Sequence, residues 1–178
     1  MRAGELQRIV DLVGDGLANI CLAVAGMALI VIVAINGANV VARYLFGSPF
    51  SWAEELMLFL MILSVFAGAI AVTWRNLHIR IDTFLERMPP AARRTALAIG
   101  SLISIAVIGV ITFHSGHIVS LLRTLDQRSD ALQTPSWIPQ SFVTIGLGTI
   151  VLIIAVKLAM SLLCPAAPTA DAPTKDKP

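Results

Sequence analysis

Charged residues and cysteines are both scarce in this sequence. Charged residues make up 13% of the chain, about half the usual share for a soluble globular domain, whereas 57% of the residues are hydrophobic. The two cysteines, Cys21 and Cys164, give no framework of spaced pairs, and the sequence contains no metal-binding array. These shortages exclude an ordinary soluble domain and a disulfide scaffold. We interpret both cysteines as packing residues and expect no metal site.

Motifs that carry chemistry are also missing from the sequence. It has no glycine-rich phosphate loop with its lysine, which excludes a nucleotide-driven pump. It has no nucleophile elbow or metalloprotease helix, so we expect no catalytic residue and no cofactor. The apolar segments lack the Gly/Pro-broken helices and paired midplane charges of a self-sufficient transporter. Together these absences favour an accessory or scaffold subunit over an enzyme or a complete transport machine.

The chain instead offers four long apolar segments. Each supplies the ~20 mostly apolar residues that a helix needs to cross the hydrocarbon core of a bilayer. None alternates as the strands of a membrane barrel do. The sequence therefore predicts an all-α integral membrane protein with four transmembrane helices in a domain of residues 1–164. The expected spans are residues 17–41, 53–73, 96–119 and 141–163.

The two ends of the chain are interpreted differently. The first apolar run is too long for the core of a signal peptide and lacks a small-residue cleavage pattern, so we expect it to be retained. Residues 165–178 are mostly Pro, Ala, Thr, Asp and Lys, a composition typical of a disordered tail. With the amino terminus inside, ten Lys and Arg residues fall on the inner side and three on the outer side. This asymmetry predicts that both termini are cytoplasmic.

The connection after the second span has the pattern of an amphipathic helix. Over residues 74–88 the apolar residues recur at steps of three and four, and Pro89 and Pro90 then end the pattern. Such a helix lies flat at the cytoplasmic surface, with its apolar face toward lipid or a partner subunit. We expect Arg75, His78 and Asp82 to form a polar network there. His78 is also the side chain that titrates near neutral pH, which is the alternative role of a proton carrier.

A second polar cluster surrounds the short connection between the first two spans. Asn39 and Arg43 share one face of the first span, and Glu54 and Glu55 begin the second. Acidic groups suit a helix amino terminus, so we expect an ion pair between Arg43 and either Glu54 or Glu55. The pair has two possible roles. It could contact a transported ion, or it could be a structural staple that ties two helices together or docks a partner, and we favour the second.

Two further features of the spans bear on packing and cofactors. Ala34, Ala38 and Ala42 form a ridge of small residues suited to close helix contact.

His114 and His117 share one face of the third span and cannot ligate one haem from both sides. No other span carries a histidine, so the sequence disfavours the alternative of a cofactor-bearing anchor of a respiratory enzyme.

A series of polar, aromatic and small residues runs along the chain in a fixed order: Asn39, Arg43-Tyr44, Pro49, Trp52, Glu54-Glu55-Leu56, Gly68-Ala69, Arg75, His78-Ile79, Asp82, Thr134-Pro135 and Trp137-Ile138-Pro139. This order resembles the small membrane subunit of the tripartite ATP-independent periplasmic (TRAP) transporters. The resemblance covers nearly the whole chain. One departure from the family pattern is Thr144-Ile145-Gly146, where members often have a proline before the glycine.

The resemblance implies an accessory subunit of a secondary transporter in the bacterial inner membrane. Such a transporter imports organic acids that a periplasmic binding protein delivers, and an ion gradient, usually of sodium, drives it. The implied partners are a large multi-helix membrane subunit, the binding protein and membrane lipids, with no nucleic acid. The alternative is a free-standing four-helix channel or small exporter. The residues assigned to the outward network and partner interface are Asn39, Arg43, Tyr44, Trp52, Glu54 and Glu55, and those that anchor the cytoplasmic helix are Arg75, His78 and Asp82.

Overall fold

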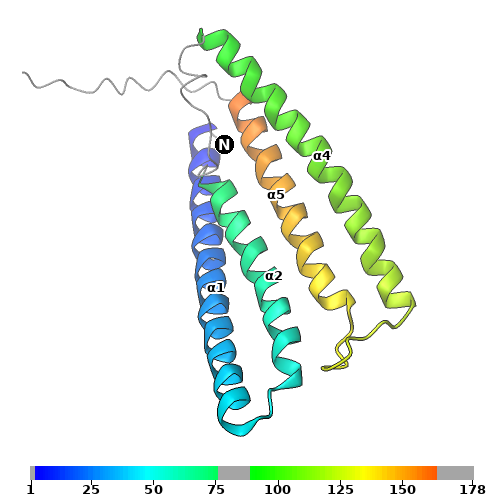
Figure 1. Ribbon diagram of the computed structural model, residues 1–178. Helices are drawn as coiled ribbons and strands as arrows, with labels where there is room; N and C mark the ends of the chain where they lie inside the picture. Colours follow the sequence, from blue (N-terminus) through cyan, green and yellow to red (C-terminus); the bar gives the residue numbers. More distant parts are fainter. Residues whose placement is uncertain (1–2, 76–88, 164–178) are drawn as a thin grey trace, which may run out of the picture.

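The computed structural model describes residues 3–75 and 89–163, which form four long helices and the connections between them. They are α1 (Ala3–Phe46), α2 (Ser51–Trp74), α4 (Pro90–Thr124) and α5 (Trp137–Leu163) (Figure 1). Each includes a stretch long and apolar enough to cross a membrane, so the prediction of an all-α membrane protein is confirmed. Of the helix expected over residues 74–88, only Trp74, which ends α2, and Arg75 lie within the described residues.

The four helices are arranged in a row. α1 packs against α2, α2 packs against α5, and α5 packs against α4, so that α5 lies between α2 and α4 (Figure 1). The hydrophobic core is correspondingly small and lies between the two central helices, where Ile70 packs near Ile150 and Ile153. In a row, unlike a closed bundle, the edge helices α1 and α4 each have one extensive interface with a neighbour. Much of their apolar surface is therefore left open.

The interface between α1 and α2 is lined by small residues. Ala18, Ala25, Ala28 and Ala42 are buried on α1, and their positions fall on a seven-residue repeat of the coiled-coil type. Small side chains at such an interface let two helix backbones approach closely. Of the ridge expected at Ala34, Ala38 and Ala42, only Ala42 belongs to this interface. Ala34 and Ala38 lie on the exposed side of α1, because they do not fall on this repeat.

A glycine sets the distance between the central helices. A Cβ atom placed on Gly146 of α5 would lie 2.8 Å from the Cβ of Phe66 on α2, closer than carbon atoms can approach without displacing one another. Only glycine fits here without a shift of the two helices. Gly146 belongs to the segment where the sequence departs from the usual TRAP pattern, and α5 runs through it without interruption.

The helices are longer than the spans expected from the sequence. α1 contains 44 residues and α4 contains 35, which correspond to about 66 Å and about 52 Å at 1.5 Å per residue. The hydrocarbon core of a bilayer is only ~30 Å thick. Residues 17–41 are thus the central part of α1, and the charged residues at its start lie beyond them. Hydropathy marks the apolar stretch, but the helix continues past it.

Candidate functional site

The charged side chains that bond to neighbouring helices or connections lie at the two ends of the helical row. We call the end that holds the α1–α2 connection and residues 125–136 the turn end. The end at which α2 and α5 finish is called the opposite end (Figure 1).

At the turn end, Asn39 fixes the connection between α1 and α2. Its side chain is only 5% exposed, and its Oδ1 atom accepts a hydrogen bond of 2.8 Å from the backbone N–H of Phe50. Phe50 immediately precedes the first turn of α2, so the bond joins the two helices across eleven residues. A buried amide oxygen that is bonded in this way has a structural role. The sequence placed Asn39 in the outward cluster, and the structure shows the backbone group that it holds.

Arg43 pairs with Glu54 rather than with Glu55. The Nη2 atom of Arg43 lies 3.7 Å from Oε1 of Glu54, and the two side chains are 55% and 72% exposed. The structure therefore resolves the choice that the sequence left open. An ion pair that is this exposed contributes at most about 1 kcal/mol to stability, because solvent screens it. It therefore adds little to the contact between the two helices.

Glu55 makes a contact that the sequence did not indicate. Its two carboxylate oxygens accept hydrogen bonds from consecutive backbone N–H groups, those of Ala131 at 2.9 Å and Leu132 at 2.8 Å. These groups lie in the connection between α4 and α5. Glu55 thus ties that connection to the first turns of α2. The two neighbouring acidic residues therefore bind different partners. Glu54 pairs with the Arg43 side chain, and Glu55 binds a backbone segment.

The aromatic residues at the turn end lie outside these contacts. Tyr44 is 82% exposed and Trp52 is 40% exposed, and the Trp52 ring packs against Phe50 with 5.5 Å between ring centroids. Exposed aromatic residues at the ends of spanning helices are typical of a membrane–water interface. The structure therefore does not join the six residues predicted for the outward network into one cluster. It divides them into three separate polar contacts and an aromatic surface.

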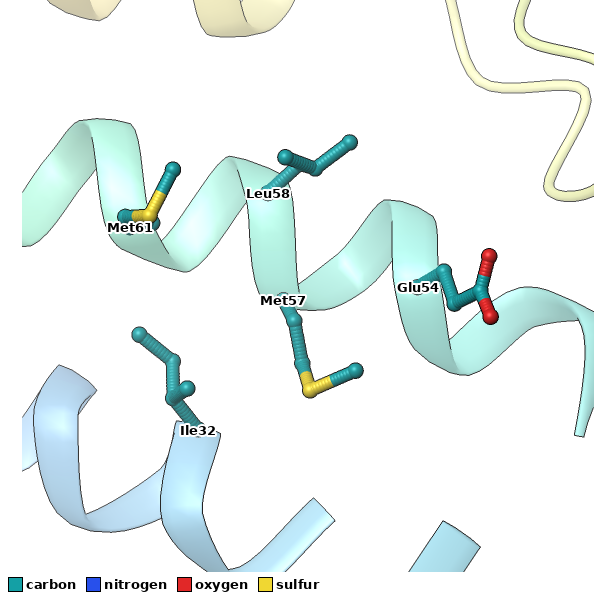
Figure 2. Close-up of a pocket in the computed structure, with 5 residues that line it drawn as sticks. All are labelled: Ile32, Glu54, Met57, Leu58 and Met61. Atoms are coloured by element: carbon teal, nitrogen blue, oxygen red, sulfur yellow. The ribbon is translucent and has the colours of Figure 1, made fainter. Parts of the chain in front are cut away.

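An open apolar groove runs between α1 and α2 near Glu54. It has a volume of about 330 Å³ and is lined by Ile32, Met57, Leu58 and Met61, with the Glu54 carboxylate at its edge (Figure 2). Its surface is mostly methyl and thioether groups, which favour an apolar occupant. Within residues 3–75 and 89–163, no group of three or more His, Cys, Asp or Glu side chains is placed to hold a metal ion.

At the opposite end, the last residues of α2 are fixed onto α1. The indole Nε1 of Trp74 donates a hydrogen bond of 2.8 Å to Oδ1 of Asp15, and Nη2 of Arg75 donates one of 2.6 Å to Oδ1 of Asn19. Gly14 gives the indole its space, because a Cβ atom there would lie 1.9 Å from the Trp74 ring. Arg75 is thus placed by α1. His78 and Asp82, its expected partners, lie outside the described residues.

Lys157 of α5 completes the contacts at the opposite end. Its Nζ donates a hydrogen bond of 3.0 Å to the carbonyl oxygen of Thr73 and a second to that of Trp74. The ammonium group also lies 5.0 Å from the centre of the Trp74 ring, within the range of a cation–π interaction. The last carbonyls of a helix have no partner within the helix, so Lys157 satisfies two of them on α2. We call Gly14, Asp15, Trp74 and Lys157 the inner clamp.

Sequence reasoning missed the inner clamp and the bonds of Glu55. Lys157 counted only among the ten Lys and Arg residues of the inner side, and no pattern in the sequence marked Asp15 as a partner of Trp74. The sequence does contain a pattern that indicates Gly14, because Gly14 is the position before Ala18 on the same seven-residue repeat of α1. The partners of Lys157 and Glu55 are backbone groups more than 70 residues away, and no local pattern marks them.

The two histidines of the third span lie on α4, where both are exposed. The ring of His114 contacts the neighbouring Phe113 edge-on, with 5.9 Å between centroids. Between them along the chain, Ser115 points to the other side of the helix. Its hydroxyl lies 2.7 Å from that of Thr144 on α5 and accepts a hydrogen bond from Gln140. This stretch of α4 therefore binds α5 through Ser115 and leaves the histidines facing outward.

Comparison with known proteins identifies the family of the chain. Residues 32–163 match the family model described as "Tripartite ATP-independent periplasmic transporters, DctQ component". The chain is also similar to the ectoine TRAP transporter small permease protein TeaB of Halomonas elongata, with 27% identity over 115 residues. That similarity covers 62% of this chain and 60% of the relative. Because the family model spans most of the chain, the resemblance found in the sequence is confirmed, and the protein belongs to the DctQ family of small TRAP transporter membrane components.

Proposed function

We propose that this chain braces a large multi-helix membrane subunit in a transporter that is driven by a sodium gradient. The transporter imports organic acids that a periplasmic binding protein delivers. Membership of the family gives the chain the role of a small accessory component. The observation that carries the proposed bracing role is the arrangement of the helices in a single row. A row leaves long apolar helix faces open to a neighbouring subunit. In a closed bundle the same faces would pack against one another in the interior.

The distribution of charge supports the same role. The charged side chains that form the ion pair and the hydrogen bonds between helices, Arg43, Glu54, Asp15 and Lys157, lie at the turn end or at the opposite end of the row. A solute pathway through the chain itself would need polar groups near the middle of the membrane. The interior between the central helices is instead occupied by isoleucines. This arrangement argues against the alternative of a free-standing channel or exporter.

We further propose an orientation with both termini in the cytoplasm of a bacterium and the chain in its inner membrane. The proposal rests on the ten inner against three outer Lys and Arg residues. The turn end, with Arg43, Glu54 and Glu55, then faces the periplasm. The inner clamp lies at the cytoplasmic surface, where a lysine that bonds helix-end carbonyls remains close to water.

Co-purification tests the accessory role. The chain is tagged at its carboxyl end, expressed with its genomic neighbours and extracted in a mild detergent. We expect a many-helix membrane protein to be recovered in constant stoichiometry. A chain that is recovered alone, remains folded and conducts ions or solutes in vesicles would contradict the proposal and support a channel.

Uptake into vesicles tests the substrate class and the coupling ion. Vesicles that hold the assembled membrane complex are supplied with purified binding protein, labelled carboxylates and an inward sodium gradient. Ectoine is included because the relative from Halomonas elongata is named for it. We expect uptake of a carboxylate to stop when potassium replaces sodium. Uptake that persists without sodium and follows a proton gradient would refute the proposed coupling ion.

A further inference from the structure

The connection between α4 and α5 is an ordered hairpin. We call residues 125–136 the outer hairpin. The backbone N–H of Ser129 donates to the carbonyl of Thr134 at 2.9 Å, and that of Ser136 donates to the carbonyl of Gln127 at 2.9 Å. Arg128 pairs with Asp126 at 3.3 Å. Because these bonds lie within the connection itself, the outer hairpin has a defined shape and does not act merely as a linker.

Glu55 fixes the outer hairpin to α2. Its two oxygens bind the N–H groups of Ala131 and Leu132 at the tip of the outer hairpin. Both acceptor atoms of one carboxylate therefore hold one short stretch of backbone, and hydrogen bonds to an ionised carboxylate are stronger than neutral ones. The outer hairpin is thereby held at the turn end, beside the start of α2.

The surface of the outer hairpin is polar. Asp126, Arg128, Asp130 and Gln133 are all exposed. A segment with exposed backbone and charged side chains does not lie in the hydrocarbon core, where unsatisfied polar groups are costly. The outer hairpin therefore faces water, at the same end of the row as the α1–α2 connection (Figure 1). Any partner of the outer hairpin therefore contacts it from the aqueous side, and lipid is not the occupant.

We propose that the outer hairpin is a docking surface for the soluble periplasmic binding protein and that Glu55 holds it in the shape that the binding protein recognises. This inference rests on the proposed function and its orientation. A surface that is already ordered loses little conformational entropy on binding, so less of the interaction free energy is spent on ordering the outer hairpin.

The charges of the outer hairpin indicate the chemistry of the partner. The Asp126 carboxylate is compensated by Arg128. Asp130 forms no ion pair with any residue that the structure describes, so the outer hairpin presents an excess negative charge near its tip. We infer that the binding protein places a lysine or arginine opposite Asp130. Docking through such a rim charge weakens as salt concentration rises.

The experiment measures the affinity of the purified binding protein for the assembled membrane complex in lipid nanodiscs. We expect Asp130→Lys to raise the dissociation constant about tenfold or more, since it reverses the exposed charge. The matched control is Asp11→Lys, which makes the same change on an exposed aspartate of α1 at the opposite end. The control is expected to bind like the original chain.

A second variant tests the role of Glu55. Glu55→Gln replaces one of the two acceptor oxygens with an amino group, which cannot accept the N–H bond. Hydrogen exchange at Ala131 and Leu132 is expected to become at least tenfold faster, and docking to weaken by about the same factor as for Asp130→Lys. Exchange at the Phe50 amide, which Asn39 holds, is the internal control and should not change.

Three results overturn the inference. The first is unchanged docking by both variants, and the second is unchanged docking by Glu55→Gln although exchange shows the outer hairpin released. The third is loss of the large subunit on purification of Asp130→Lys, which would place the outer hairpin in the interface between membrane subunits. A chain without substitutions that fails to recover a large subunit contradicts the proposed function instead, so the two failures are distinguishable.

Discussion

Lys157 of α5 binds the end of α2 at Trp74 in two ways, through the indole ring and through the backbone. Its ammonium group lies 5.0 Å from the ring centroid and donates a hydrogen bond to the carbonyl oxygen of the same residue. Trp74 in turn donates to Asp15 of α1. One side chain at the end of α2 therefore connects three of the four helices, and this connection can be tested directly.

Replacement of Lys157 by methionine should destabilise the fold. The change keeps a long apolar side chain but removes the hydrogen bonds that the ammonium group donates to the Thr73 and Trp74 carbonyls. We expect the free energy of unfolding in detergent to fall by about 1–3 kcal/mol. Lys157→Arg is the control, because it retains the charge and the donors and should lose less. Equal stability of the methionine variant and the original chain would show that the clamp contributes nothing.

Replacement of Gly14 by alanine should also disturb the inner clamp, through α1 rather than through α5. The new methyl group would overlap the Trp74 ring, which has a carbon atom 1.9 Å from the expected Cβ position. We expect a loss of about 1–3 kcal/mol in stability, together with a red shift of tryptophan fluorescence as the ring moves toward water. Gly16→Ala is the matched control, because nothing lies within 4 Å of its Cβ position. Alanine there should be neutral or stabilise the helix by up to ~1 kcal/mol.

Loss of the buried amide of Asn39 should lower the stability of the protein more than loss of the nearby Asn36 side chain. Asn39→Ala leaves the backbone N–H of Phe50 without its acceptor in a part-buried position, at a cost of about 1–3 kcal/mol. Asn36 is exposed on α1, and its replacement by alanine should change stability by no more than about 0.5 kcal/mol. Thermal unfolding of the two variants in the same detergent measures the difference. Equal losses would mean that the bond to Phe50 has no energetic role.

The ion pair of Arg43 and Glu54 should couple the two residues weakly. A double-mutant cycle that replaces each residue by glutamine is expected to give an interaction energy below about 1 kcal/mol, and high salt should reduce it further. The measurement is the stability of the two single variants and the double variant at two salt concentrations. A larger, salt-independent coupling would show that the pair is shielded from water, as it would be beneath a bound partner subunit.

The sequence predicted the helices well because hydropathy and length determine them. Four apolar stretches of sufficient length require helices in a membrane, and the structure contains helices at all four. The packing of α1 was also present in the sequence, in the seven-residue repeat that includes Ala18 and Ala25. The ridge predicted at Ala34, Ala38 and Ala42 shares only Ala42 with this repeat, since alanines four residues apart follow a different face of the helix.

Less of the candidate site could be predicted from the sequence. The pairing of Arg43 with an acidic residue was predicted because the two residues are close along the chain. The bonds from Glu55 to Ala131 and Leu132 depend on α5 lying beside α2, and the order of helices in a row cannot be deduced from hydropathy. The inner clamp depends on the same order, since Lys157 can reach the end of α2 only when α5 lies beside α2.

The order of helices also has a consequence for the biogenesis of the protein. α1 pairs with α2 and α4 pairs with α5, so each half of the chain can form its own helical hairpin as it leaves the insertion machinery. The two hairpins then need only one lateral association in the bilayer, along α2 and α5. Glu55 and Lys157 form polar bonds near opposite ends of that contact. Two halves translated as separate polypeptides should therefore find one another in the membrane and associate in a single register.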